Sequence, residues 1–164
     1  MKTSDVYVET AAQAAAIFRA ELPKEQKEER VFVLPLDANG KMLAKPIVVS
    51  VGNEDGTTVI DAGAVFRAAL KADAAEFILA HNHPSGDLRP SKADLAATEE
   101  LKDLSARLSV KFLDHLILGN SSDFVSLEEL GISNRRRTHF RPARKGAPSG
   151  CVCFGEGNLE PRRR

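Results

Sequence analysis

Cysteine, aromatic residues and long apolar runs are scarce in this chain of 164 residues. Its two cysteines, Cys151 and Cys153, lie one residue apart, which is a poor arrangement for a disulfide that closes a fold. We therefore expect a reducing, cytoplasmic environment. The longest apolar stretches, such as 77–80, fall far short of the roughly 20 residues that a membrane helix needs. The first residues lack the pattern of a secretory signal, so we expect neither a membrane span nor export.

Net charge is also lacking, because 23 Lys and Arg residues balance 23 Asp and Glu residues. The balance hides an uneven distribution. Residues 133–164 carry a charge of +7 from eight Arg, one Lys and two Glu, and residues 1–132 carry −7. Since 43% of the residues are apolar, the chain can bury one core, and we predict one domain over 1–132 and a basic, disordered tail over 133–164. Such a tail either contacts an anionic partner such as nucleic acid or is simply solvated.

Hydrophobic periodicity predicts an alternation of helices and strands. The predicted elements, in chain order, are a helix over 10–22, strands over 31–36 and 42–51 joined by a turn at 37–40, a helix over 61–72, a strand over 77–80, a helix from Ser91 onward, and strands over 110–118 and 123–126. Thr10 and Asp61 are suitable N-caps. Pro35 cannot donate a hydrogen bond to a ladder, so it should face an open edge or lie at a bulge.

The helix that begins at Ser91 should bury one face, because its apolar residues are spaced by four, three and four positions. These residues are Ala97, Leu101, Leu104 and Leu108. Helices that alternate with strands in this order are typical of an α/β fold, here with a mixed sheet flanked by helices.

One loop lies where a buried strand ends and a helix begins, which is a common place for functional sites in α/β proteins. Residues i and i+2 of an extended backbone project to the same side, so His81 and His83 can present imidazole nitrogens to one point. Pro84 and Pro90 restrict the residues before them, and the loop can turn back and bring Asp94 to the histidines.

Two imidazoles and one carboxylate, with a fourth position left for water, are typical of a catalytic zinc site. Bound Zn²⁺ lowers the pKa of water to about 7 and so supplies hydroxide at neutral pH. The same residues also have simpler explanations. Ser91 and Asp94 suit the start of any helix, and a histidine at the end of a strand is commonly structural. The residues alone leave metal binding and plain structural roles open.

Four residues, His81, His83, Ser91 and Asp94, follow one another at the intervals His-x-His-x7-Ser-x2-Asp. This pattern resembles the JAMM motif of JAB/MPN proteins. Two segments resemble the RadC-like branch in particular: His-Asn-His-Pro-Ser-Gly-Asp at 81–87 and Leu-Asp-His-Leu-Ile-Leu-Gly at 113–119. The resemblance covers about 10–131. It implies a JAB/MPN fold, a sandwich like that of cytidine deaminases, with Zn²⁺ bound by His81, His83 and Asp94.

The resemblance also implies a glutamate at the start of an upstream strand. Glu29 precedes an apolar run and fits this position, whereas the neighbouring Glu28 would send its carboxylate to the other face of the sheet. By similarity, Glu29 would take a proton from the metal-bound water and pass it to a leaving amine. Ser91 would steady the oxyanion. The implied function is zinc-dependent hydrolysis of a peptide or isopeptide bond in a protein or peptide substrate.

Two further residues match the family, Asp114 and His115. They either support the metal site from behind or form a buried pair that satisfies itself, and we prefer the second interpretation. Many RadC-like proteins also carry a helix-hairpin-helix region before this domain. We expect none here, which weakens any inference of duplex DNA binding.

Other classes fit these residues less well. Non-haem iron oxygenases also use two histidines and an acid, but usually in the order His-x-acid. Nucleases of the HNH kind spread their residues over a longer unit, and a zinc deaminase needs a Pro-Cys-x-x-Cys segment. The main alternative is a nucleic-acid-associated accessory protein, related to DNA repair, whose core binds metal and whose basic tail contacts DNA. In that tail we interpret Cys151 and Cys153 as incidental.

Overall fold

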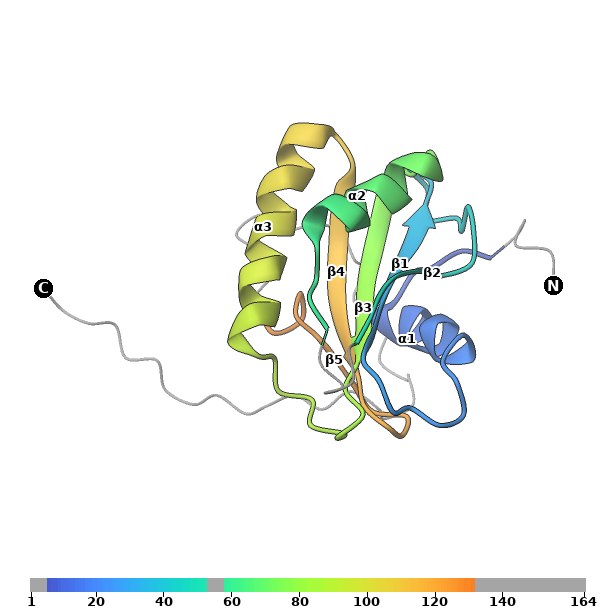
Figure 1. Cartoon of the computed structure of the whole chain (residues 1–164). Coiled ribbons are helices and arrows are strands. Elements are labelled where there is room, and N and C mark those ends of the chain that lie inside the picture. The colour runs from blue at the N-terminus through green and yellow to red at the C-terminus, as the bar shows by residue number, and fades with distance from the viewer. Residues whose placement is uncertain (1–5, 53–57, 132–164) are drawn as a thin grey trace, which may run out of the picture.

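The computed structural model describes residues 6–52 and 58–131 (Figure 1). Within these ranges the elements are α1 (Ala11–Ala20), β1 (Arg30–Leu36), β2 (Ile47–Val51), α2 (Ala62–Lys71), β3 (Glu76–Asn82), α3 (Lys92–Leu108), β4 (Lys111–Leu118) and β5 (Phe124–Ser126). The predicted order of helices and strands is confirmed. No helix in the described part of the chain is long and apolar enough to cross a membrane. The predicted tail, with Cys151 and Cys153, lies outside the described residues.

The strands form one five-stranded sheet in the order β2-β1-β3-β4-β5. The β3–β4 pair is parallel, and the other three pairs are antiparallel. The sheet is therefore mixed, as the sequence predicted. Helix α1 covers one face, and α2 and α3 cover the other (Figure 1), so the chain has the α/β architecture expected from the alternation of helices and strands.

Strand alternation divides the core into two layers. In β1, Phe32 and Leu34 pack toward Phe18 of α1. Val31 and Val33 point to the opposite face and pack with the residues of α2 and α3. The second layer matters for function, because the segment after β3 and the start of α3 both lie at its edge.

Side-chain caps begin all three helices, which explains where each one starts. Thr10 and Ser91 form capping boxes with Gln13 and Asp94, and Asp61 accepts a hydrogen bond from the N–H of Gly63. Each cap satisfies backbone N–H groups that have no partner within the helix. The N-caps predicted at Thr10 and Asp61 are confirmed.

The hairpin differs from the prediction in its second strand. β2 begins at Ile47 rather than at residue 42, and Met42 makes only an isolated bridge to Leu36. Pro46 directly precedes β2 and has no N–H to donate, so a ladder cannot extend regularly through it. Pro35 lies beyond the end of the β1–β2 ladder, where its carbonyl accepts a hydrogen bond of 3.0 Å from the N–H of Leu43.

The predicted buried face of α3 is wrong at its C-terminal end. Leu101 is fully buried, but Leu108 is 44% exposed, because it is the last residue of the helix and lies beyond the apolar cluster. The inward face begins instead with two polar residues, Asp94 and Thr98, both of which are buried. The start of α3 therefore brings polar groups into the layer between helix and sheet.

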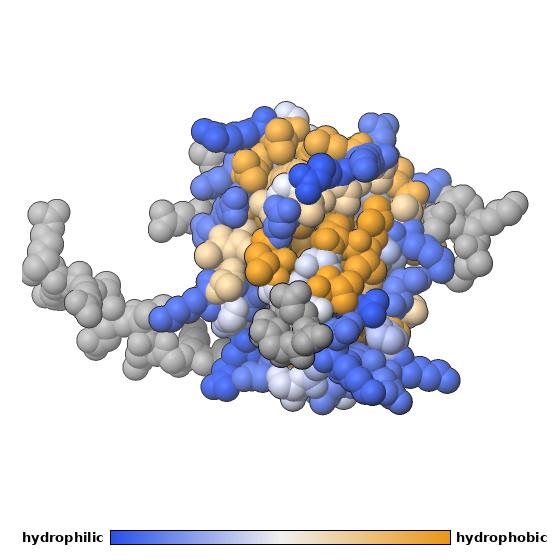
Figure 2. All heavy atoms as spheres, in the orientation of Figure 1, coloured by the Kyte–Doolittle hydropathy of each residue, from blue (hydrophilic) through white to orange (hydrophobic). Residues whose placement is uncertain are grey.

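Exposed apolar residues occur on the edge strand β2 and on the neighbouring helix α2. Val48 and Val51 of β2 and Leu70 of α2 are each more than one third exposed. Figure 2 shows apolar side chains gathered over this region, with hydrophilic side chains around it.

Candidate metal centre

The predicted ligands come from the end of β3 and the first turn of α3. In β3, Phe77 and Leu79 point into the layer under α2 and α3, so strand alternation directs His81 to the same side. His83 follows one residue after the end of β3, and Asp94 lies three residues beyond the N-cap of α3. His81 and Asp94 are buried, and His83 is partly buried.

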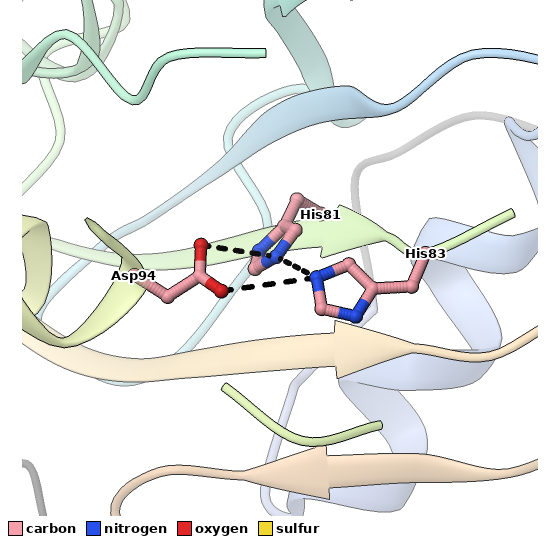
Figure 3. A group of neighbouring side chains, drawn as sticks. All are labelled: His81, His83 and Asp94. Carbon is pink, nitrogen blue, oxygen red and sulfur yellow. Dashed lines mark hydrogen bonds and ion pairs between the residues drawn. The ribbon is translucent and has the colours of Figure 1, made fainter. Parts of the chain in front are cut away.

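The structure brings His81, His83 and Asp94 together (Figure 3). The two Nε2 atoms of the histidines are 2.8 Å apart. Nε2 of His81 lies 3.3 Å from Oδ1 of Asp94, and Nε2 of His83 lies 3.8 Å from Oδ2. One potential ligand atom from each residue falls within 4.8 Å of the others. The three side chains therefore converge on one point, as the loop geometry allowed and the family resemblance implied.

A hydrogen bond sets the proton of His83. Its Nδ1 donates to the backbone carbonyl of Asp87, and because a carbonyl only accepts, Nδ1 must carry the hydrogen. In the neutral ring the lone pair is then on Nε2, which faces His81 and Asp94. Nitrogen lone pairs and a carboxylate at such distances repel one another unless a cation or a shared proton lies among them. Imidazole nitrogen and carboxylate oxygen are ligands that Zn²⁺ accepts, so the donor set fits this metal.

The loop that carries His83 is held in shape by local hydrogen bonds. The N–H of His83 donates to the carbonyl of Leu118 at 2.8 Å, and its own carbonyl accepts from Gly86 at 2.9 Å. Gly86 has φ +78, and an added Cβ there would lie 2.9 Å from the side-chain amide of Asn120. The backbone conformation therefore favours glycine, and a larger residue would also displace the side chain of Asn120.

Asp94 is held as an anion by its surroundings. Burial alone would raise its pKa, but the nearby ring of His81, together with hydrogen bonds from Ser91, outweighs burial and lowers that pKa below its usual value. Its Oδ2 accepts from the backbone N–H of Ser91 at 2.7 Å, and its own N–H donates to Oγ of Ser91 at 3.1 Å. Ser91 is therefore the N-cap of α3, and this role uses the oxygen of its hydroxyl rather than the proton.

Glu29 is not one of the three residues in this cluster. It immediately precedes β1, in which Val31 lies opposite His81. Strand alternation places Glu29 on the same face as Val31 and places Glu28 on the other. The carboxylate of Glu29 accepts a hydrogen bond of 3.0 Å from the N–H of Thr58, whereas the exposed Glu28 forms an ion pair with Arg30 at 3.6 Å. Of the two glutamates, only Glu29 lies on the face of the sheet to which His81 points.

Two buried residues lie behind His81: His115, for which support of the site was the less favoured interpretation, and Thr98, which was not predicted. Nδ1 of His81 is 2.8 Å from Nε2 of His115, and Nδ1 of His115 is 2.7 Å from the hydroxyl of Thr98. Burial lowers the pKa of His115 well below its ordinary value, so the ring is neutral. Thr98 lies four residues after Asp94 on α3, and this helical spacing is the signal in the sequence that places it near the ligands.

The preferred interpretation of Asp114 and His115 as a self-satisfied pair is wrong. The carboxylate of Asp114 accepts hydrogen bonds from the hydroxyl of Ser126 at 2.6 Å and from the N–H of Glu128 at 3.0 Å. It also accepts from the backbone N–H of His115, but the imidazole of His115 turns to His81 and Thr98 instead. Burial raises the pKa of Asp114 to about 7. The two neighbours therefore belong to separate hydrogen-bond networks.

A mixed sheet with three helices and a cluster of two histidines and an aspartate is the architecture of a JAB/MPN domain. A family model described as the RadC-like JAB domain matches residues 8–132. The chain belongs to this family, as the resemblance in its sequence predicted.

Proteins of several organisms are similar to this chain. The UPF0758 protein tlr1707 of Thermosynechococcus vestitus is 40% identical over 123 residues, which are 75% of this chain and 48% of that protein. A UPF0758 protein of Microcystis aeruginosa is 37% identical over 78% of this chain and 51% of its own length. A third, from Methanosarcina mazei, is 39% identical over 66% of this chain and 46% of its own length. The chain spans about half the length of these relatives.

Proposed function

We propose that this chain is a zinc-dependent hydrolase that cleaves a peptide or isopeptide bond. The observation that supports the proposal is the convergence of two imidazole nitrogens and a carboxylate from His81, His83 and Asp94 within 4.8 Å. Three protein ligands of this kind leave a position open for water, which is typical of catalytic rather than structural zinc sites. Zn²⁺ bound by these three residues would supply hydroxide near neutral pH and polarise a carbonyl group.

Glu29 is the proposed base. It lies on the face of the sheet to which His81 points, and the hydrogen bond from Thr58 holds its carboxylate on that side. A carboxylate in this position takes a proton from the attacking water and gives it to the leaving amine. The same residue therefore acts as a base and then as an acid.

Ser91 is the proposed donor to the oxyanion. Its oxygen accepts the N–H of Asp94 in the capping box, and its hydroxyl proton remains to be donated to a substrate carbonyl. Because the cap fixes the Oγ atom in place, the donor is oriented before the substrate arrives, which is the condition for effective stabilisation of a developing negative charge.

Matched substitutions test the proposal. We expect the purified protein to bind about one zinc ion per chain, by the ligand count of such sites, and Glu29→Gln to keep the zinc while it loses hydrolysis. His81→Ala and His83→Ala should lose the metal. Glu28→Gln is the control, because it changes the neighbouring exposed glutamate and should keep both zinc and activity. Equal zinc content in all four variants would contradict the ligand assignment.

The substrate can be found with the same variant. Glu29→Gln retains the ligands and lacks the base, so it should hold an uncleaved substrate. We propose to compare peptides with ordinary bonds and peptides with lysine-linked isopeptide bonds, and to follow the two fragments by mass spectrometry, since an ordinary bond yields a new amino terminus and an isopeptide bond yields a free lysine ε-amine. Cleavage of neither class by the zinc-loaded protein would contradict hydrolysis, even if metal binding is found.

A second function is favoured by the uneven charge of the sequence. Residues 133–164 carry +7, and a basic segment of this kind gives nucleic-acid binding that weakens steeply with salt and lacks sequence preference. In this proposal the domain is an accessory to DNA repair, and the tail contacts DNA. Deletion of 133–164 should then abolish salt-sensitive DNA binding and leave zinc content unchanged. Unchanged DNA affinity after the deletion would remove the basis of the proposal.

A further inference from the structure

A chain of buried hydrogen bonds runs behind His81, on the side of the ring away from the other ligands. Nδ1 of His81 lies 2.8 Å from Nε2 of His115. On the other side of that ring, Nδ1 lies 2.7 Å from the hydroxyl of Thr98. The hydroxyl in turn donates to the backbone carbonyl of Asp94 at 2.7 Å. His115 and Thr98 are both completely buried, so water does not compete for these bonds.

Only one arrangement of protons satisfies this chain with neutral rings. The carbonyl of Asp94 can only accept, so the single proton of the Thr98 hydroxyl is donated there. The hydroxyl must then accept from Nδ1 of His115, which places the proton of that ring on Nδ1 and the lone pair on Nε2. That lone pair accepts a hydrogen from Nδ1 of His81. The remaining nitrogen of His81, Nε2, is left with its lone pair facing His83 and Asp94.

We propose that His115 and Thr98 are positioning residues that fix the proton of His81 on Nδ1 and so present Nε2 to a cation. The inference deepens the proposed function, since it rests on His81 as a metal ligand through Nε2. It also explains why two elements act together. The carboxylate of Asp94 faces His81 and His83, and its backbone carbonyl accepts the last hydrogen bond of the series. The series therefore connects α3 to β3 through His115 of β4.

The two histidines of the site are controlled in different ways. The proton of His83 is set by the carbonyl of Asp87, four residues away in the same loop. The proton of His81 depends on His115 and Thr98, which lie on other elements of the fold. A change at Thr98 should therefore affect His81 and leave His83 as it is, and this selectivity separates positioning from general damage to the fold.

Three variants of α3 test the proposal. Thr98→Val keeps the shape of the side chain and removes the hydroxyl, whereas Thr98→Ser keeps the hydroxyl. Ser105→Ala is the control, because the Ser105 hydroxyl also joins α3 to the start of β4, donating to the carbonyl of Val110 at 2.7 Å and accepting from Phe112 at 2.8 Å. The measurements are the ¹⁵N shifts of the histidine rings in the metal-free protein, which report the protonated nitrogen, and the affinity for Zn²⁺.

We expect His81 to carry its proton on Nδ1 in the unchanged protein, in Thr98→Ser and in Ser105→Ala. In Thr98→Val a part of the population should move to Nε2, with His83 unaffected, and the affinity for Zn²⁺ should fall by roughly 10- to 100-fold, as for other partners of metal-bound histidines. Thr98→Ser should restore the affinity.

The proposal is overturned if His81 of the unchanged protein carries its proton on Nε2, a result that needs no variant to fold. It is also overturned if Thr98→Val keeps both the Nδ1 proton and the affinity of the unchanged protein. Failure of the proposed function gives a different result. If the unchanged protein binds no Zn²⁺, the metal assignment falls, while the tautomer of His81 in the metal-free protein is still measured and decides the role of Thr98 and His115.

Discussion

The layer between the sheet and helices α2 and α3 is apolar at one end and polar at the other. At the apolar end, Phe77 of β3 lies between two rings, with centroids 5.3 Å from Phe66 of α2 and 5.2 Å from Phe112 of β4. At the polar end, the same two strands carry His81 and His115. One continuous layer therefore contains both an aromatic core and a candidate metal centre.

The two ends are equally buried but differ in how burial is made favourable. Phe77 and His115 are both inaccessible to solvent. Apolar rings are stabilised there by removal from water and by close packing. Polar groups at the same depth need hydrogen bonds, and within the described residues every buried side-chain nitrogen and oxygen has a partner. The stability of the polar end thus depends on complete hydrogen bonding, whereas the stability of the apolar end depends on how fully the side chains fill the space.

Substitution at the apolar end should have the largest effect on stability. We expect Phe77→Ala to lower the free energy of unfolding by about 3–5 kcal/mol, because it removes a fully buried ring and leaves a cavity. Zinc content of the folded protein should stay unchanged, since the site lies at the other end of the layer. Urea unfolding and metal analysis check both points. Leu70→Ala, at a residue 52% exposed, is the control and should change stability by less than about 0.5 kcal/mol. Loss of zinc from folded Phe77→Ala would show that the two ends are not independent.

The buried carboxyl of Asp114 should make stability depend on pH. Its pKa is about 7 in the folded chain and about 3.9 when unfolded, so the folded state holds the proton to higher pH. Stability is then full below about pH 4 and falls as pH rises toward 7, by up to about 1.4 kcal/mol per pH unit. Asp114→Asn keeps the hydrogen bonds to backbone N–H groups and cannot titrate. Unfolding measured from pH 5 to pH 8 should therefore give a flatter curve for the variant, and two parallel curves would argue against a titrating Asp114.

The smallest effect is expected at the helix caps. Ser91→Ala and Thr10→Ala each remove the side-chain acceptor of a capping box, and each should lower the free energy of unfolding by about 1 kcal/mol. The two variants compare α3, which begins at the polar end of the layer, with α1, which lies on the opposite face of the sheet. Only Ser91→Ala should also slow hydrolysis. Equal activity in the two variants would leave Ser91 with the role of a cap alone.

Local patterns in the sequence accounted for most of the fold. Alternation and helical spacing predicted the order of the elements, and the N-caps Thr10 and Asp61 were visible because capping depends only on residues within one turn. The prediction failed where contacts with residues distant in the sequence determine burial or the length of a strand. Leu108 has the spacing of a buried residue but lies beyond the end of the core, and β2 is shortened before Ile47.

The candidate site shows the same division. His81, His83 and Asp94 lie within 14 positions of one another, so their spacing and the prolines between them allowed convergence, and the resemblance to a family made it a prediction. Glu29 was assigned through the resemblance to a family, because 52 positions separate it from His81 and only the pairing of β1 with β3 brings the strands together. Thr98 was missed, since its one signal is a spacing of four residues from Asp94, and a threonine within a helix is not itself a typical metal ligand.

The sequence by itself determined the elements, the alternation of apolar and polar positions along the strands, and the ligand spacing around the loop, because these depend on neighbours a few residues apart. Only the tertiary structure decided that the ring of His115 turns to His81 rather than to Asp114, and that Thr98 completes the connection to Asp94. The physical reason is that a buried imidazole takes the orientation in which both ring nitrogens have partners, and those partners come from separate strands and a helix.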